Sequence, residues 1–131
     1  MQARGWLVAA GVLGAVGVAM GAYVSHGLGF IAEPAAREVA RAALSTAVQQ
    51  HMLHVLALLG VGAVALRAPS RWLTAASALF VLGILLFSGL VYARWLLGFD
   101  ALRAMVPWGG TCLILGWLSV AVAACKLRTP A

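Results

Sequence analysis

Residues 46–66, TAVQQHMLHVLALLGVGAVAL, form the stretch that decides the fold. From residue 48 to residue 66 this run carries no Asp, Glu, Lys or Arg. An apolar run of about 20 residues matches the hydrocarbon thickness of a bilayer when it is helical. The stretch therefore predicts a helix that spans a membrane. Its polar side chains, which include Gln50, His51 and His54, gather near the start of that helix.

Three further apolar runs, at 6–25, 72–93 and 104–125, are also free of charged residues. A charge in the middle of a membrane helix costs roughly 2.5–3.5 kcal/mol on insertion scales, so this exclusion is informative. The first run is longer than the apolar part of a usual signal peptide, and we expect it to be retained as a helix. Together with 48–66, the runs predict an all-α fold: one transmembrane domain of four helices over residues 1–131.

The amino-acid composition is not that of a soluble globular protein. Of 131 residues, 64% are hydrophobic and 9% are charged, whereas a soluble domain is about half apolar and a quarter charged. A chain this short cannot bury so much apolar surface in its own core, so the lipid bilayer is its expected environment. The net charge of +6 comes from single basic residues at the ends of the runs. This scatter gives no patch for nucleic acid, and we expect no nucleic-acid partner.

The distribution of basic residues predicts the orientation, because Lys and Arg are enriched in cytoplasmic loops. Four spans place both termini and the loop between the second and third spans on one side. That side carries five basic residues and no acid: Arg4, Arg67, Arg71, Lys126 and Arg128. The other side carries four basic and three acidic residues: Arg37, Arg41, Arg94, Arg103, Glu33, Glu38 and Asp100. We therefore expect both termini to be cytoplasmic.

The connection before the second span is predicted to be helical as well. Glu33 followed by Pro34 is typical of a helix start, because proline suits the first helical position and an acid suits the positive helix end. Arg37 lies four residues after Glu33 and is placed to pair with it. A helix over 34–66 would be about 50 Å long, against a hydrocarbon core of about 30 Å. We therefore expect a bend or break at 45–50, with a short amphipathic helix between the first two spans.

Small residues form stripes on the predicted helices, and such stripes let two backbones approach closely in a membrane. The stripe of the first span is Ala10, Gly14, Gly17, Gly21 and Ser25, and that of the fourth is Gly109, Cys112, Gly116, Ser119 and Ala123. On the third span, a spacing of 3.6 residues groups Thr74, Ala78, Val81, Leu85, Ser88 and Tyr92 on one face. The predicted helix-packing residues are Gly14, Gly17, Gly21, Ser88, Gly89, Gly109, Gly110 and Gly116.

The polar stripe of the second span has two interpretations. Polar side chains at membrane depth usually face the bundle interior and have partners, so Gln50 and His54 would hydrogen-bond neighbouring helices. The alternative is a ligand site formed by His26, Gln50, His51 and His54, with His26 and His54 as weak candidates for binding metal or haem. A histidine pair without thiolate or carboxylate company is a weak metal signal. No nucleophile with an oriented base and no phosphate-binding loop is apparent, so the chain is not expected to be an enzyme.

Four short stretches occur together in an order that resembles a known family. They are GAYVSHGL (21–28), TAVQQHMLHVLALL (46–59), GILLFSGLVY (83–92) and VPWGGTCLILGW (106–117). The ordered set resembles the small four-helix membrane protein family of unknown function that includes transmembrane protein two-five-six, with bacterial inner-membrane homologues. The resemblance covers nearly the whole chain. It implies an integral protein of the bacterial inner membrane and implies no established reaction.

Individual residues carry this resemblance. The family pattern is matched by His26, His54, Phe87, Ser88, Gly89, Pro107, Gly109, Gly110, Gly116 and Trp117. The departures surround the polar stripe: Val24-Ser25 replaces a small pair before the first histidine, Gln50 stands where a tyrosine is expected, and Leu90 replaces a serine. A role that needs a tyrosine hydroxyl at position 50 is therefore not expected here.

Three functions fit these observations. The first is an accessory or structural subunit, a self-associating bundle or a component of a larger membrane complex, because two small-residue faces exceed what four helices need internally. The second is a haem-, metal- or quinone-binding membrane protein that uses His26 and His54, which we expect to lie near one another at one membrane face. The third is a small transporter or channel. The sequence identifies no cofactor, and we expect none to be bound.

Overall fold

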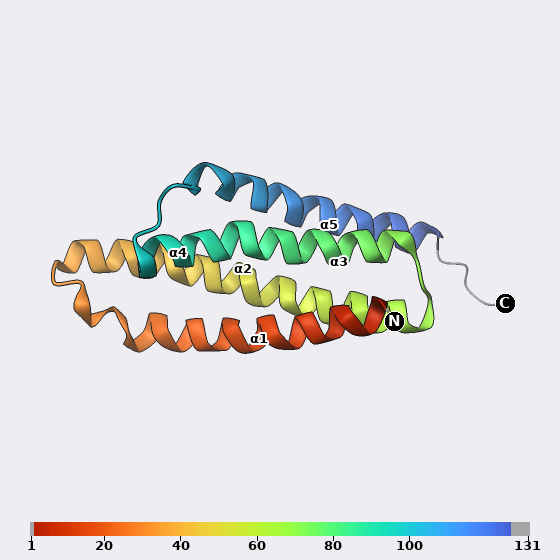
Figure 1. The fold of residues 1–131 in the computed structure, drawn as a ribbon, viewed down its shortest axis with the longest axis horizontal. Helices are drawn as coiled ribbons and strands as arrows, with labels where there is room; N and C mark the ends of the chain where they lie inside the picture. Colours follow the sequence, from red (N-terminus) through yellow and green to blue (C-terminus); the bar gives the residue numbers. More distant parts are fainter. Residues whose placement is uncertain (1, 127–131) are drawn as a thin grey trace.

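The computed structural model describes residues 2–126 and is helical along most of this length. Figure 1 shows the helices running roughly parallel or antiparallel to one another, so that the molecule is elongated. The elements in chain order are α1 (Gln2–His26), the 3₁₀ turn η1 (Leu28–Phe30), α2 (Pro34–Arg67), α3 (Arg71–Ile84), the π-helical turn η2 (Leu85–Gly89), α4 (Leu90–Leu97), the 3₁₀ turn η3 (Arg103–Met105) and α5 (Val106–Lys126).

Four helical segments of the described chain are long and apolar enough to cross a membrane. They are Ala3–Phe30, Pro34–Arg67, Arg71–Leu97 and Arg103–Lys126. Each contains one of the four runs predicted from the sequence. The prediction of an all-α fold with four transmembrane helices is therefore confirmed.

The second span differs from the prediction in one respect, because α2 runs without interruption from Pro34 to Arg67. The segment before the span is helical, as expected, but it forms the first turns of α2 and not a separate helix. The break expected at 45–50 is absent from this helix. Thr46 illustrates why the polar residues there are tolerated, since its hydroxyl donates to the Ala42 carbonyl one turn earlier, at 3.1 Å.

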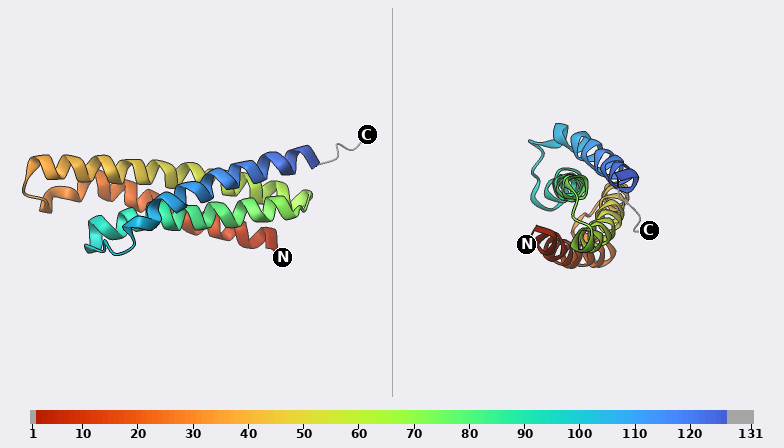
Figure 2. Two further views of the ribbon diagram at one scale, coloured as in Figure 1. Left: turned by 90° about the horizontal axis from the view of Figure 1, so that it is seen from above. Right: turned by 90° about the vertical axis from the view of Figure 1, so that its right-hand side faces the viewer.

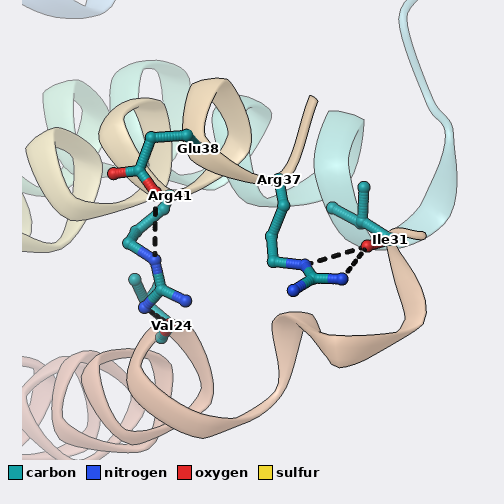
Figure 3. Close-up of polar contacts among 5 residues, drawn as sticks. All are labelled: Val24, Ile31, Arg37, Glu38 and Arg41. Atoms are coloured by element: carbon teal, nitrogen blue, oxygen red, sulfur yellow. Dashed lines mark hydrogen bonds and ion pairs between the residues drawn. The ribbon is translucent and has the colours of Figure 1, made fainter. Parts of the chain in front are cut away.

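The start of α2 also holds the end of α1 in place (Figure 3). Arg41 donates from Nη1 to the Val24 carbonyl in the last turns of α1, at 3.1 Å. Arg37 donates from Nε and Nη2 to the Ile31 carbonyl, at 2.9 and 2.6 Å. Terminal helix carbonyls lack partners within their own helix, so these arginines stabilise the turn between α1 and α2.

The expected pairing of Arg37 with Glu33 is replaced by two separate interactions. The Glu33 carboxylate accepts a hydrogen bond from the Ala35 backbone N–H at 3.1 Å and thereby caps the start of α2, with Pro34 at the first helical position. Arg37 is thus free to donate to the Ile31 carbonyl. The predicted helix start at Glu33-Pro34 is confirmed.

The helices form a row, in which α1 packs on α2, α2 on α3, and α3 on α5. Figures 1 and 2 show α2 and α3 lying between α1 and α5, which occupy the two ends of the row. One cluster of buried side chains, centred on Phe80, joins α2, α3 and α5. A second cluster, around Leu44 and Tyr92, joins α1, α2 and α4. The end helix α1 is the least buried span, because only 17% of its most apolar stretch is buried in the protein.

The third span is not a uniform α-helix, because the π-helical turn η2 interrupts it. Ser88 and Tyr92 are buried, as their predicted shared face requires, but Ala78 and Leu85 of the same predicted face are exposed. The buried residues of α3 are Leu73, Ala76, Ser77, Phe80, Gly83 and Ile84. A π-turn accommodates one extra residue. Extending an α-helical spacing back from Ser88 therefore shifts the assigned face by one position.

Candidate functional site

The face of α1 that meets α2 is built around Gly17, which is buried. A Cβ atom at Gly17 would collide with the side chain of Met52 and come within 3.6 Å of the His51 ring. Gly14 and Gly21 lie about one turn to either side of Gly17. A Cβ atom added at each would lie 3.4 and 3.7 Å, respectively, from a valine side chain of α2. These three glycines lie where α1 approaches the polar segment of α2 most closely.

The contact of α5 with the third span depends on two glycines. A Cβ atom at Gly109 would lie 2.9 Å from the Phe87 Cα atom, in the π-helical turn. A Cβ atom at Gly116 would lie 2.6 Å from the Phe80 ring. Gly110 is different, because the nearest atom to its hypothetical Cβ is 4.0 Å away, on the Phe87 side chain. Only the first two positions require a residue without a side chain.

Sequence reasoning missed two other close approaches. A Cβ atom at Gly62 would lie 2.9 Å from the Leu7 side chain, and one at Gly83 would overlap the Leu113 side chain. Neither glycine belongs to a stripe of small residues, so the spacing of residues in the sequence does not predict these contacts. Gly89, a predicted packing residue, has only an ordinary contact at 3.8 Å, to a carbonyl of its own span.

His54 lies between three spans and both of its ring nitrogens have partners. Nδ1 is 2.7 Å from the Gln50 carbonyl oxygen, which can only accept, so Nδ1 carries the proton. Nε2 then accepts a hydrogen bond from the Trp117 indole N–H of α5, at 3.1 Å. The Phe80 ring of α3 packs against the same imidazole, with ring centroids 5.5 Å apart. His54 therefore joins α2 to α3 and α5 as a neutral imidazole.

His51 and Ser88 connect α2 to the third span on the side nearer α1. His51 is 2% exposed, and its Nδ1 lies 3.2 Å from the Tyr92 hydroxyl oxygen of α4. The Ser88 hydroxyl, in the π-helical turn, donates to the Ala47 carbonyl of α2 at 2.8 Å. His51 Nε2 is buried and makes no hydrogen bond with any described residue. The two contacts set the register between α2 and the third span.

The structure does not bring His26 to this cluster. His26 ends α1 and is exposed, and its neighbour Val24 contacts Arg41 of α2. Thirteen residues of helix separate Arg41 from His54, or about 20 Å along the axis. The expectation that His26 and His54 lie near one another is therefore wrong. The reason is that α1 ends beside the early turns of α2, whereas His54 lies deep in the span.

The ligand-binding candidates thus have different surroundings. Gln50 is half-buried and contributes its backbone carbonyl to His54. A ligand atom at either nitrogen of His54 would have to displace Gln50 or Trp117. Among residues 2–126, no three side chains of the His, Cys, Asp and Glu types are grouped closely enough to hold a metal ion. The arrangement suits hydrogen bonding between helices, and a ligand role for these residues stays a prediction.

Two partners of the histidines were not predicted as such. Tyr92, which the sequence groups with Ser88 on one face of the third span, is 8% exposed and contacts His51. Trp117, which the sequence singles out only for the family resemblance, is 46% exposed and also donates its indole N–H to His54. The tryptophan is 63 residues from the histidine. A pairing at that separation has no local signal in a single sequence.

The fold and these contacts define a multi-span integral membrane protein whose buried polar groups join its helices. The chain belongs to the family described as a protein of unknown function (DUF423), whose model matches residues 20–110. The predicted assignment to a small membrane protein family of unknown function is confirmed. No solved structure shows significant similarity to this chain.

Relatives in several organisms are also described as membrane proteins. A UPF0382 membrane protein of Haemophilus influenzae is 36% identical over 115 residues, which cover 86% of each chain. The UPF0382 inner membrane protein YgdD of Escherichia coli K12 is 29% identical over 128 residues, or 98% of this chain and 95% of that one. The UPF0382 membrane protein YwdK of Bacillus subtilis is 34% identical over 120 residues, or 88% and 94%.

Proposed function

We propose that this protein is an accessory subunit of the bacterial inner membrane: a single four-helix transmembrane domain that associates laterally with a second copy or with a larger complex. Its buried histidines serve as hydrogen-bonding links between its own helices. The observation that carries the proposal is the outer face of α1, defined as Gly11, Ala15, Ala19 and Ala22. All four residues are exposed, and a Cβ atom added at Gly11 would meet nothing within 4 Å.

This outer face has the composition of a helix-packing surface, and none of residues 2–126 buries it. Glycine destabilises a helix by about 1 kcal/mol relative to alanine, and at Gly17 the contact with α2 accounts for its presence. At Gly11 no neighbouring atom does so. In lipid, helices associate through small residues spaced four apart, because close packing replaces the hydrophobic effect as the driving force. Gly11, Ala15 and Ala19 have that spacing.

The test is a comparison of two glycine-to-leucine variants by native mass spectrometry after release from the membrane in mild detergent. Gly11→Leu is expected to shift the population from the oligomer or complex to the monomer. Gly60→Leu is the matched control, since Gly60 is exposed on α2 and a Cβ atom there would also meet nothing within 4 Å. Disulfide cross-linking of Ala15→Cys in whole membranes, with Cys112 and Cys125 replaced by serine, checks the interface before detergent is added.

Two results would contradict the proposal. One is a wild-type protein that is monomeric in mild detergent and whose Ala15→Cys variant forms no cross-link in the membrane. The other is an equal loss of association in Gly11→Leu and Gly60→Leu.

The orientation with cytoplasmic termini is part of this proposal. At the end that carries the termini, Arg71 and Lys126 stack on the Trp72 ring, at 5.4 and 4.9 Å from its centroid. At the opposite end, Arg37 and Arg41 donate to backbone carbonyls, and Arg94 pairs with an aspartate. The excess of basic charge at the terminal end favours the cytoplasmic side. Arg128, which contributed to the predicted excess, lies outside the described residues.

The alternative functions have less support from the geometry. A haem or metal held between His26 and His54 would require the two residues to meet, whereas Arg41, which contacts the end of α1, lies about 20 Å along α2 from His54. A channel or transporter would require a continuous polar path, whereas apolar and aromatic side chains form the clusters around Phe80 and around Leu44 and Tyr92. The accessory role therefore remains the proposal that the described contacts favour.

A further inference from the structure

A hollow of about 280 Å³ lies where α2, α4 and the start of α5 converge. Leu90 and Trp95 of α4 form one wall, and Val106 and Pro107 at the start of α5 form another. Ala43 of α2 also lines the hollow. The walls are mostly apolar, and the hollow is near the lower end of the volume range of small-molecule pockets. It is large enough for part of an acyl chain.

The charged residues of the hollow come from the end of the third span and the connection to α5. Arg94, Asp100 and Arg103 all line it. The Arg94 Nε atom is 3.2 Å from the Asp100 carboxylate, and its guanidinium also lies over the Trp95 ring, 5.5 Å from the centroid. Arg103 is exposed in the turn η3. Two guanidinium groups and one carboxylate leave the hollow with one net positive charge.

This combination indicates the chemistry of the occupant. Apolar walls within a membrane protein suit a hydrocarbon chain, and a net positive rim suits an anion. Arginine is preferred at phosphate sites, because its planar guanidinium donates two parallel hydrogen bonds and stays charged. The Asp100 carboxylate would repel an anion, but its ion pair with Arg94 offsets this repulsion. Because Arg94 is engaged by Asp100, Arg103 is the principal donor to the ligand.

We infer that the hollow binds one anionic phospholipid, with its phosphate at Arg103 and Arg94 and the first part of an acyl chain along Leu90, Trp95 and Val106. Arg103 is the specificity-determining residue, because its positive charge favours a headgroup with a net negative charge over a zwitterionic headgroup, whose ammonium group it repels. The site is independent of the outer face of α1, because none of Gly11, Ala15, Ala19 and Ala22 lines the hollow.

The experiment is native mass spectrometry of the full chain in mild detergent, titrated with dioleoylphosphatidylglycerol. Dioleoylphosphatidylcholine and inorganic phosphate are the comparison probes. The wild-type protein is expected to retain one phosphatidylglycerol in preference to phosphatidylcholine. Arg103→Gln is expected to weaken phosphatidylglycerol binding about fivefold, the effect of one basic residue at an anionic lipid surface. Val106→Phe, which fills the hollow, is expected to weaken the binding of both lipids.

Arg67→Gln is the matched control, because Arg67 is an exposed arginine at the opposite end of the bundle. It is expected to leave phosphatidylglycerol binding unchanged. The inference is overturned if Arg103→Gln and Arg67→Gln weaken binding equally, which would show a non-specific charge effect. It is also overturned if the wild-type protein binds the two lipids equally, or if inorganic phosphate at the lipid concentration displaces phosphatidylglycerol.

Discussion

Single hydrogen bonds decide how the second and third spans fit together. The Ser88 hydroxyl donates to a carbonyl of another helix, Ala47, whereas the Ser77 hydroxyl donates to the Leu73 carbonyl of its own helix, at 3.0 Å. Both serines are fully buried. A buried serine thus has two roles here. The Ser88 hydroxyl links two helices, whereas the Ser77 hydroxyl only makes a hydrogen bond within its own helix.

Ser88→Ala is therefore expected to lower the free energy of unfolding by about 0.6–2 kcal/mol, the range of interhelical hydrogen bonds in membranes. Ser77→Ala is the matched control and is expected to have a smaller effect, because no contact between helices is lost. Reversible unfolding in mixed micelles of dodecyl maltoside and sodium dodecyl sulfate gives both values. Equal effects in the two variants would show that the Ser88–Ala47 contact does not stabilise the bundle.

At the scale of elements, the π-helical turn η2 determines which face of the third span is buried. It places Ser88 against α2 and brings the backbone of Phe87 beside Gly109 of α5. The prediction from the sequence assumed a uniform spacing of 3.6 residues, which the extra residue of a π-turn breaks. The predicted face was therefore right for Ser88 and Tyr92 and wrong for Ala78 and Leu85.

The neighbouring glycines of α5 test this contact. Gly109→Ala is expected to destabilise the protein by about 1–3 kcal/mol, because the added methyl group meets the backbone of Phe87, which cannot rotate away. Gly110→Ala is expected to be neutral or stabilising by at most about 1 kcal/mol, because its methyl group has space and alanine is the better helix former. The same unfolding assay measures both. A similar destabilisation by the two changes would contradict the close approach of α5 to η2 at Gly109.

At the scale of the whole molecule, the row of helices exposes α1 and α5 at its two ends. This arrangement leaves the outer face of α1 available for a partner and places the lipid-binding hollow at the junction of α2, α4 and α5. Figure 1 shows that α5 ends on the side where α1 begins, and the last turn of α5 contains the exposed Cys125. A native cysteine can therefore report the orientation in the membrane.

With cytoplasmic termini, a membrane-impermeant maleimide is expected to label Cys125 in inverted inner-membrane vesicles and not in intact spheroplasts. Labelling in detergent shows that the thiol is reactive, and Cys125→Ser should abolish the signal. A cysteine introduced at Asp100 in a chain without native cysteines should give the reverse pattern. Labelling of Cys125 in intact spheroplasts would contradict the proposed orientation.

The sequence by itself determined that the chain is an integral membrane protein, where its four spans lie and where α2 begins. Each depends on a local property: the length and polarity of an apolar run, or the capping preference of Glu33 and Pro34. Only the tertiary structure decided the partners of His51 and His54, the separation of His26 from His54, and the buried face of the third span. Those features depend on contacts between distant helices and on one extra residue in a turn, which local periodicity does not encode.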